Sequence, residues 1–202
     1  MYDVLIIGGG VSGVSCALVL GSAKNKPFAA GKKIGLIAHQ KASSLQNAVF
    51  NNAYGIAPGK LGSELLDESL EQLQNLYPHV EQITKEKVLE IKGNLNNFTV
   101  VTNANTYKTK LVVIAIGASN PFTIEGLDAF VMQHQKLPIE KNRIQLKNED
   151  HLVKEGVYVI GVLAGHRSQL SIAAGSGASV ATDILSLWNE GKHSMVHDAL
   201  GK

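Results

Sequence analysis

The chain has 202 residues, of which 45% are hydrophobic and 18% charged, and its formal net charge is +2 at pH 7. This length predicts one domain, since domains usually hold about 100–200 residues, and the apolar fraction excludes a disordered chain. A net charge so close to zero argues against a nucleic-acid partner. The lone cysteine, Cys16, excludes an internal disulfide, a paired-cysteine redox site and a cysteine-rich zinc site.

The first apolar segment, residues 4–20, has the composition of a signal peptide but not its organisation. No basic residue precedes it, Asp3 stands at its start, and four glycines interrupt it. No other segment reaches the roughly 18 apolar residues of a membrane span. We therefore expect a soluble protein without a membrane partner, and the single cysteine suits the reducing cytoplasm.

The first elements in chain order predict a β–α–β unit. Residues 4–7 form a short apolar run bounded by glycines, which is typical of a buried strand, and a helix of small and apolar residues follows at 12–20. A second buried strand is expected at 34–38. Such crossovers are right-handed and join parallel strands, so this unit predicts an α/β fold with a Rossmann-like parallel sheet.

The middle of the chain predicts a loop, a helix and a small antiparallel β-meander. Residues 39–62 are polar and read as a long loop, or short helical pieces, over a ligand. A helix is expected to begin at Ser63, which would act as its N-cap. The meander is predicted because apolar and polar residues alternate at 88–91, at 98–102 and around Tyr107.

The last third returns to the parallel sheet. Buried strands are expected at 111–116 and 157–160, with a short strand at 143–146 between them. A long helix over 168–188 closes the fold. Residues 191–202 are expected to form a frayed tail.

A G-x-G-x-x-G motif at residues 8–13 connects the first strand to the first helix. In such a motif Gly8 allows the tight turn, Gly10 lets a diphosphate approach the backbone, and Gly13 lets the helix pack closely on the strand. The N–H groups of the helix N-terminus favour the negative charge of the diphosphate. The residues that this reasoning assigns to a dinucleotide are Gly8, Gly10, Val11, Ser12 and Gly13.

One part of the usual dinucleotide site is missing. An Asp or Glu normally ends the second strand and binds the ribose hydroxyls, but this chain has Ala38, His39 and Gln40 there. His39 or Gln40 could form a neutral hydrogen bond to the ribose, and a plain loop position is an equally good interpretation of His39. The missing acid weakens the case for ordinary NAD binding.

With these features in order, the chain resembles the FAD-binding domain of the thioredoxin reductase-like flavoproteins, in the two-dinucleotide-binding-domain superfamily. The resemblance implies a single FAD-binding domain over residues 1–202. The blocks that carry it are residues 3–17, 46–47, 55–59, 63–66, 111–117, 156–161 and 169–177.

The resemblance also implies roles for single residues. Asn47 would lie near the flavin or its ribityl chain, and the backbone at Val88 would face the adenine. Gly117 would lie close to the dinucleotide, and Gly161 would lie against the ribityl phosphate.

The last helix would face the flavin ring. Gln169, Leu170 and Ser171 would open this helix, and its N–H groups would point at the pyrimidine carbonyl of the flavin. A helix N-terminus in that place stabilises negative charge on the reduced ring.

Three features depart from the family pattern. An Asp of the family is Val162 here, and the redox-active C-x-x-C is absent because Cys16 is alone. Only 40 positions separate Gly117 from Val157, where the family inserts its nicotinamide-binding domain. Such a domain needs about 50 residues or more, so we expect it to be missing.

These features predict an FAD-dependent oxidoreductase that transfers hydride or electrons at the flavin without a redox dithiol. Its electrons would come from an external donor, either NAD(P)H or a reductase, and pass to an unknown acceptor. A first alternative is an FAD-binding module that needs a partner or holds the cofactor without turnover. A second is an NAD(P)-dependent dehydrogenase. An open flavin face predicts a homodimer, or a lid formed by residues 40–60.

Six further side chains have both a structural and a functional interpretation. Cys16 is expected in the core, and His134 on the surface. His193 and His197, at helical spacing, could be imagined as metal ligands, but a tail is the better interpretation, so no metal site is predicted. His166 and Arg167 precede the last helix, and contact with the ligand and a plain loop position are equally good interpretations of this pair. No catalytic residue can be assigned.

Overall fold

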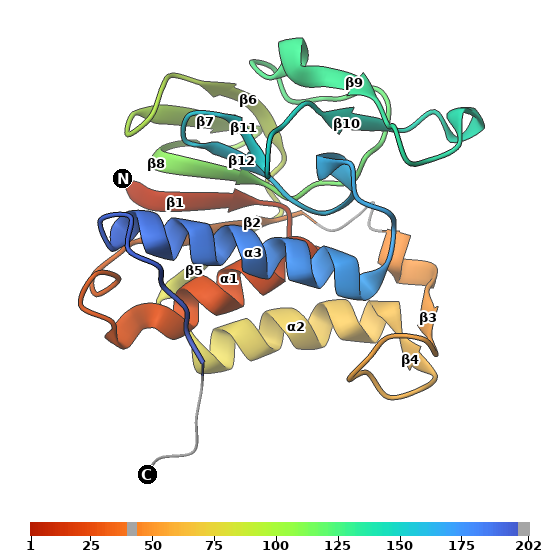
Figure 1. The fold of residues 1–202 in the computed structure, drawn as a ribbon, viewed down its shortest axis with the longest axis horizontal. Coiled ribbons are helices and arrows are strands. Elements are labelled where there is room, and N and C mark those ends of the chain that lie inside the picture. The colour runs from red at the N-terminus through yellow and green to blue at the C-terminus, as the bar shows by residue number, and fades with distance from the viewer. Residues whose placement is uncertain (40–43, 198–202) are drawn as a thin grey trace.

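The computed structural model describes residues 1–39 and 44–197. Its centre is a sheet whose five parallel strands lie in the order β5–β2–β1–β8–β12 (Figure 1). In chain order this is 3-2-1-4-5, the arrangement of Rossmann-like sheets. The predicted α/β class is confirmed. The strands are β1 (Tyr2–Ile7), β2 (Ile34–Ala38), β5 (Val80–Thr84), β8 (Thr106–Ile114) and β12 (Val157–Val159).

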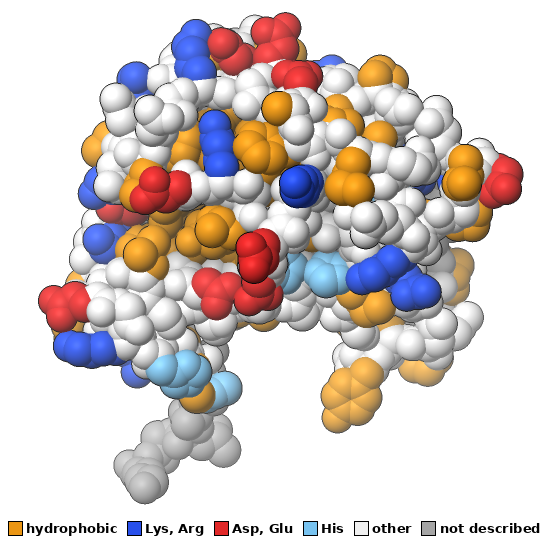
Figure 2. Space-filling view, turned by 45° about the horizontal axis from the view of Figure 1, so that its top comes forward, with side chains coloured by type: hydrophobic (Ala, Val, Ile, Leu, Met, Phe, Trp, Pro, Cys, Tyr) orange, Lys and Arg blue, Asp and Glu red, His pale blue; other side chains and the backbone are white. Residues whose placement is uncertain are grey.

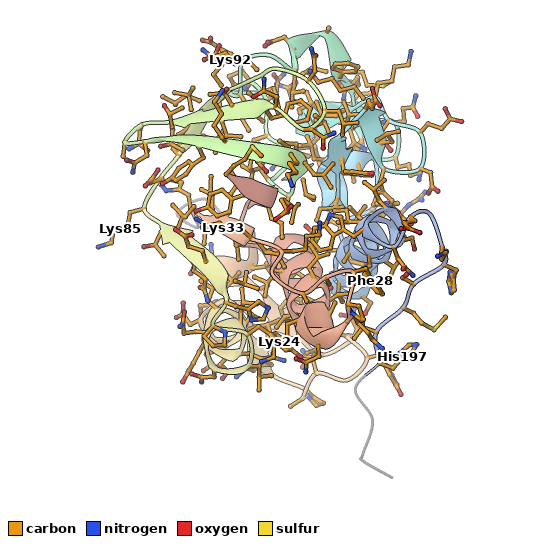
Figure 3. All side chains as sticks on the ribbon, turned by 90° about the vertical axis from the view of Figure 1, so that its left-hand side faces the viewer. Lys24, Phe28, Lys33, Lys85, Lys92 and His197 are labelled. Carbon is orange, nitrogen blue, oxygen red and sulfur yellow. The ribbon has the colours of Figure 1, made fainter. Side chains whose placement is uncertain are left out.

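Helices cover one face of the sheet, and smaller β elements cover the other (Figures 1 and 3). The helices are α1 (Val11–Ser22), α2 (Gly62–Leu76) and α3 (Leu170–Trp188). The other face carries the meander strands β6 (Val88–Lys92) and β7 (Phe98–Thr102) and the hairpin of β9 (Val131–Gln133) and β10 (Ile144–Leu146). The remaining elements are β3 (Val49–Phe50), β4 (Lys60–Leu61), β11 (Leu152–Lys154) and the 3₁₀ turns η1 (Ala23–Asn25), η2 (Ser44–Asn47), η3 (Asp128–Phe130), η4 (Ile139–Lys141) and η5 (Gly161–Ala164).

The apolar run of β1 supplies two separate cores. Val4 and Ile6 pack among the residues on the helix side of the sheet, whereas Leu5 and Ile7 pack on the meander side. All four side chains are at most 2% exposed. A strand buried on both faces needs a continuous apolar run, which explains why this segment does not alternate with polar residues.

Two boundaries differ from the sequence prediction. Tyr107 and residues 111–116 were expected in separate strands, but β8 is one strand, because its first half pairs with β7 and its second half with β12. The second helix begins at Gly62 with Leu61 as N-cap, and no side chain caps it. The prediction of Ser63 as N-cap is therefore wrong, although Glu64 does lie in the first turn.

Helix α3 is the one helix of the described residues that is long and apolar enough to cross a membrane by length and composition alone. Core helices share this composition, and α3 has a buried face that includes Val180 and Ile184. Beyond it, residues 191–197 form no helix or strand, but Ser194 is only 5% exposed and its N–H donates to Ser186 Oγ at 3.1 Å. This part of the predicted tail is thus attached to α3, and residues 198–202 lie outside the described residues.

Candidate functional site

A groove of about 820 Å³ lies at the carboxyl ends of the parallel strands. Its volume is in the upper part of the roughly 300–1,000 Å³ that ligand pockets occupy. In open α/β sheets, ligands bind at this edge, where the strand order reverses. Here the reversal falls between β1 and β8, and the groove is lined by Ile7 at the end of β1 and by Ala115 just after β8.

The groove brings together ten of the residues predicted from the sequence. Of the remaining four, Gly13, Asn47 and Ser171 are not among the described lining residues, and Gln40 lies outside the described part of the chain. Asn47 and Ser171 are exposed. The predicted residues that line the groove are Gly8, Gly10, Val11, Ser12, His39, Val88, Gly117, Gly161, Gln169 and Leu170.

Glycine stands at the three motif positions for different structural reasons. Gly8 has a φ of +120°, and a Cβ there would lie 2.4 Å from the Ala115 carbonyl oxygen. A Cβ on Gly13 would lie 1.9 Å from the carbonyl oxygen of Gly8. A Cβ on Gly10 would meet no atom within 4 Å. Gly8 and Gly13 therefore serve the packing of the turn, while Gly10 leaves free space in the groove.

Two helix N-termini point their first turns into the same groove. Helix α1 begins after Gly10 and α3 after Gln169, neither has a capping side chain, and neither has an acidic residue in its first turn. The first N–H groups of a helix carry a partial positive charge and favour anions. The donor set therefore fits a ligand with a negatively charged diphosphate.

Close packing between α1 and α3 sets the distance between these two N-termini. A Cβ on Gly177 would lie 2.0 Å from the Ser12 carbonyl oxygen, and Ser15 Oγ donates to the Ala174 carbonyl at 2.8 Å. Next to them, Ser176 Oγ accepts from the Gly161 N–H at 2.9 Å. The glycine at 177 thus serves helix packing, which the sequence motif alone did not indicate.

The acid that lines the groove, Glu86, is fully engaged by the protein. Its carboxylate accepts hydrogen bonds from Thr102 Oγ1 at 2.6 Å, Asn105 Nδ2 at 2.7 Å and Tyr107 Oη at 2.8 Å. Burial raises the pKa of Glu86, but these hydrogen bonds outweigh it and hold the pKa below its usual range. Burial, and then the hydrogen bond to Glu86, raises the pKa of Tyr107 to about 12. Glu86 is therefore ionised and hydrogen-bonded, which suits a structural role better than proton transfer.

Beyond Gly117, the sequence analysis assigned no single residue of the segment between β8 and β12 to the groove. Ser119, Thr123, Leu137, Lys141 and Arg143 all line it. Arg143 Nη1 donates to Ser119 Oγ at 3.0 Å. No motif marks this segment, and the only sequence signal is that Arg143 is one of two arginines in the chain.

His134, expected on the surface, is only 2% exposed, so that prediction is wrong. Its Nδ1 accepts from the Lys136 N–H at 3.1 Å, which leaves Nε2 as the donor to the Val162 carbonyl at 3.1 Å. Both neighbours in sequence, Gln133 and Gln135, are exposed. His134 ties the β9–β10 hairpin to η5, which lines the groove.

The other candidates lie away from the described lining. His166 and Arg167 are not part of it, and the ring of His166 lies beside that of His151, with the centroids 5.1 Å apart and the planes tilted by 50°. Burial, together with the positive potential of His151 and Lys136, lowers the pKa of His166. No group of three metal-binding side chains occurs among residues 1–39 and 44–197. Cys16 is fully buried, as predicted.

This sheet order, glycine-rich turn and groove define a Rossmann-like dinucleotide-binding domain. The model of the pyridine nucleotide-disulphide oxidoreductase family matches residues 2–166, and the chain belongs to this family. It corresponds to the single FAD-binding domain of that superfamily. Between β8 and β12 there are only short elements, and the longest strand among them has three residues.

The chain is also similar in sequence to ferredoxin–NADP reductases. The chain is 24% identical over 195 residues to the one from Leuconostoc mesenteroides, covering 96% of this chain and 52% of the relative. It is 30% identical over 134 residues to the one from Levilactobacillus brevis, covering 63% and 39%. The chain thus spans about half the length of the curated relatives it matches.

Solved structures with the same fold include two reductases. A thioredoxin reductase from Gloeobacter violaceus superposes with a TM-score of 0.75 at 13% identity, covering 99% of each chain. A ferredoxin-flavin thioredoxin reductase from Clostridium acetobutylicum gives 0.68 at 16% identity, covering 93% of this chain and 98% of the other. At such identities the likeness shows the fold alone.

Proposed function

We propose that this chain is an FAD-binding flavoprotein oxidoreductase that works with an external electron donor. The observation that carries the proposal is the convergence of the glycine-rich turn and two uncapped helix N-termini on one groove of about 820 Å³. The family membership of the chain supports the same conclusion. A bound FAD supplies the hydride and electron transfer chemistry of such an enzyme.

The residues of the chain hold and orient the cofactor. The N–H groups of Val11 and Ser12 bind the diphosphate beside the free space at Gly10. The backbone around Val88 and the side chain of His39 line the adenosine part. The first turn of α3, from Gln169, presents its partial positive charge to the flavin ring.

The electron donor is NAD(P)H or a separate reductase, and the acceptor is a second redox partner. The relatives are named for a reaction between ferredoxin and NADP, which supports an external redox partner of this kind. These 202 residues supply no dithiol, because Cys16 is their single cysteine and burial raises the pKa of its thiol. We place the protein in the cytoplasm, because a single unpaired cysteine suits a reducing compartment.

The arrangement also supports a second candidate, an FAD-binding module that holds the cofactor without turnover. The ionised carboxylate of Glu86 is already bound by three donors, so this groove acid serves structure rather than proton transfer. An NAD(P)-dependent dehydrogenase is a third candidate, and the missing acid after β2 argues against it.

One experiment separates these three functions. The purified protein is reconstituted with FAD, freed of unbound flavin, and mixed anaerobically with NADPH or NADH while the visible flavin absorbance is followed. Bleaching by a nicotinamide nucleotide, and its reversal by a quinone or a ferredoxin, identifies the oxidoreductase. Bound FAD that neither nucleotide reduces, alone or with an added ferredoxin and its reductase, identifies the module. A protein that binds NAD(P)H but no flavin contradicts the proposal.

We also propose that a second copy of the chain covers the open side of the site. Three apolar side chains of the β3–β4 hairpin are exposed, namely Val49 at 55%, Tyr54 at 100% and Leu61 at 44%. This hairpin projects from the molecule beside the carboxyl end of the sheet (Figure 1). Light scattering of the FAD-loaded protein tests the homodimer, and a monomer at micromolar concentration contradicts it.

A further inference from the structure

The segment between β8 and β12 gives the groove a wall of its own. We call Ser119, Thr123, Leu137, Lys141 and Arg143 the insert wall, since all of them line the groove and come from this segment. Figure 1 shows the β9–β10 hairpin of the segment on the side of the sheet opposite the helices. The insert wall and the first turn of α1 therefore enclose the ligand space from different layers of the fold.

Among the described residues, the two cations of the insert wall have no counter-charge. No carboxylate of the described residues lies within ion-pair distance of Lys141 or Arg143. Glu86, the acid that lines the same groove, is occupied by its three donors. On the face that Figure 2 shows, cations and acids lie interspersed. The groove therefore faces two positive charges that are left for a ligand.

The backbone around Arg143 is held in place, and so is one edge of its guanidinium. Arg143 pairs with Ser119 in a β-bridge, and the Ile144 N–H donates to the Ala118 carbonyl at 3.1 Å. The Nη1 atom donates to Ser119 Oγ at 3.0 Å. The other N–H groups of this planar fork have no partner in the described structure, and such a fork matches a phosphate or carboxylate.

We propose that Lys141 and Arg143 form a phosphate clamp that closes on a phosphate group of the bound nucleotide. The proposal rests on the proposed function in that it takes the groove as a nucleotide site. The phosphate has two possible sources, the diphosphate of FAD itself or a phosphate of a nicotinamide nucleotide that binds second. In either case the segment between β8 and β12 supplies the positive charge for one ligand phosphate.

The test compares a double variant with a matched control. The variant is Lys141→Gln with Arg143→Gln, and the control is Lys136→Gln with Lys147→Gln, since both control lysines are exposed, lie in the same segment and do not line the groove. Inorganic pyrophosphate and FAD are titrated calorimetrically into each apo protein. NADPH is titrated into the FAD-loaded protein while the flavin absorbance is followed. Because all four side chains are exposed, thermal unfolding of both variants should match the wild type.

We expect the clamp variant to bind pyrophosphate about tenfold or more weakly, as is usual when charge-assisted hydrogen bonds are lost, and the control to bind it as the wild type does. A parallel loss for FAD assigns the clamp to the cofactor, whereas a loss confined to NADPH assigns it to the second nucleotide. Arg143→Lys, which keeps the charge but not the fork, should give a smaller loss.

Equal affinities of the variant and the wild type for all three probes would overturn the clamp. So would a wild-type protein that binds none of them. A wild type that fails to bind FAD but binds pyrophosphate through Lys141 and Arg143 contradicts the proposed function and leaves the clamp standing. If the wild type binds FAD but the double variant binds FAD, pyrophosphate and NADPH as tightly as the wild type, the clamp is contradicted and the proposed function stands.

Discussion

A Cβ on Gly13 would lie 1.9 Å from the carbonyl oxygen of Gly8, so the first turn of α1 rests directly on the end of β1. On its other side, α1 meets α3, where a Cβ on Gly177 would lie 2.0 Å from the Ser12 carbonyl oxygen. The turn is therefore fixed by contacts within the protein on both sides. Of the three motif glycines, only Gly10 leaves free space for a ligand.

Gly13→Ala should destabilise the apo protein by about 1–3 kcal/mol or more, because the added methyl meets backbone that cannot move aside. Urea unfolding followed by circular dichroism measures this. Gly175→Ala is the matched control, since a Cβ there meets nothing within 4 Å in helix α3, and it should leave stability unchanged or raise it slightly. Wild-type stability of Gly13→Ala would refute the packing role.

His134→Leu should lower the free energy of unfolding by about 1–3 kcal/mol. The reason is that the Val162 carbonyl and the Lys136 N–H both lose their hydrogen-bond partner at a buried site. The loss should extend to FAD affinity, since Val162 lines the groove. His193→Leu, on the exposed tail, is the control. If both variants unfold at the same denaturant concentration as the wild type, His134 does not anchor η5.

Glu86 should make the stability of the protein depend on acid pH. Its pKa is lower in the folded state than in the unfolded chain, so its contribution is complete above the unfolded value of about 4.3 and is lost as the pH falls through the folded value. Glu86→Gln should therefore show a flatter fall in the free energy of unfolding below pH 5. Parallel curves for the two proteins would contradict this linkage.

Cys16 should be inert in the native protein. Its side chain is fully buried, and burial raises the pKa of the thiol, so little thiolate is present at pH 8. A thiol reagent such as Ellman's reagent should label the native protein only at the rate of unfolding, and the single thiol should react at once in guanidinium chloride. Rapid labelling of the native protein would instead indicate a reactive cysteine and reopen thiol chemistry.

The sequence predicted most clearly the strands and the helix that carry long apolar runs. The strands at β1 and β2 and the last helix were found because their apolar runs and glycines leave few alternatives. The strand β5 was not predicted, because Glu81 and Thr84 are exposed and no apolar run marks it. It lies at the edge of the sheet, where only one neighbour, β2, defines it.

The candidate site was predictable only where a motif marks it. The glycine-rich turn and the start of α3 reach the groove as expected, because short-range sequence sets their geometry. Lys141 and Arg143 come from a segment without any pattern, and the burial of His134 depends on a carbonyl 28 residues away. Such long-range contacts leave no periodic signal in the chain.

The affinity of Gly10→Val for FAD tests the central claim most directly. At Gly10 φ is −78°, which any residue adopts, and a Cβ meets nothing within 4 Å, so the variant should fold with close to wild-type stability. Its side chain would occupy the space assigned to the diphosphate. Titration followed by flavin fluorescence should show FAD affinity reduced by at least about tenfold, with Gly175→Ala unchanged. A Gly10→Val protein that binds FAD as tightly as the wild type would contradict the account.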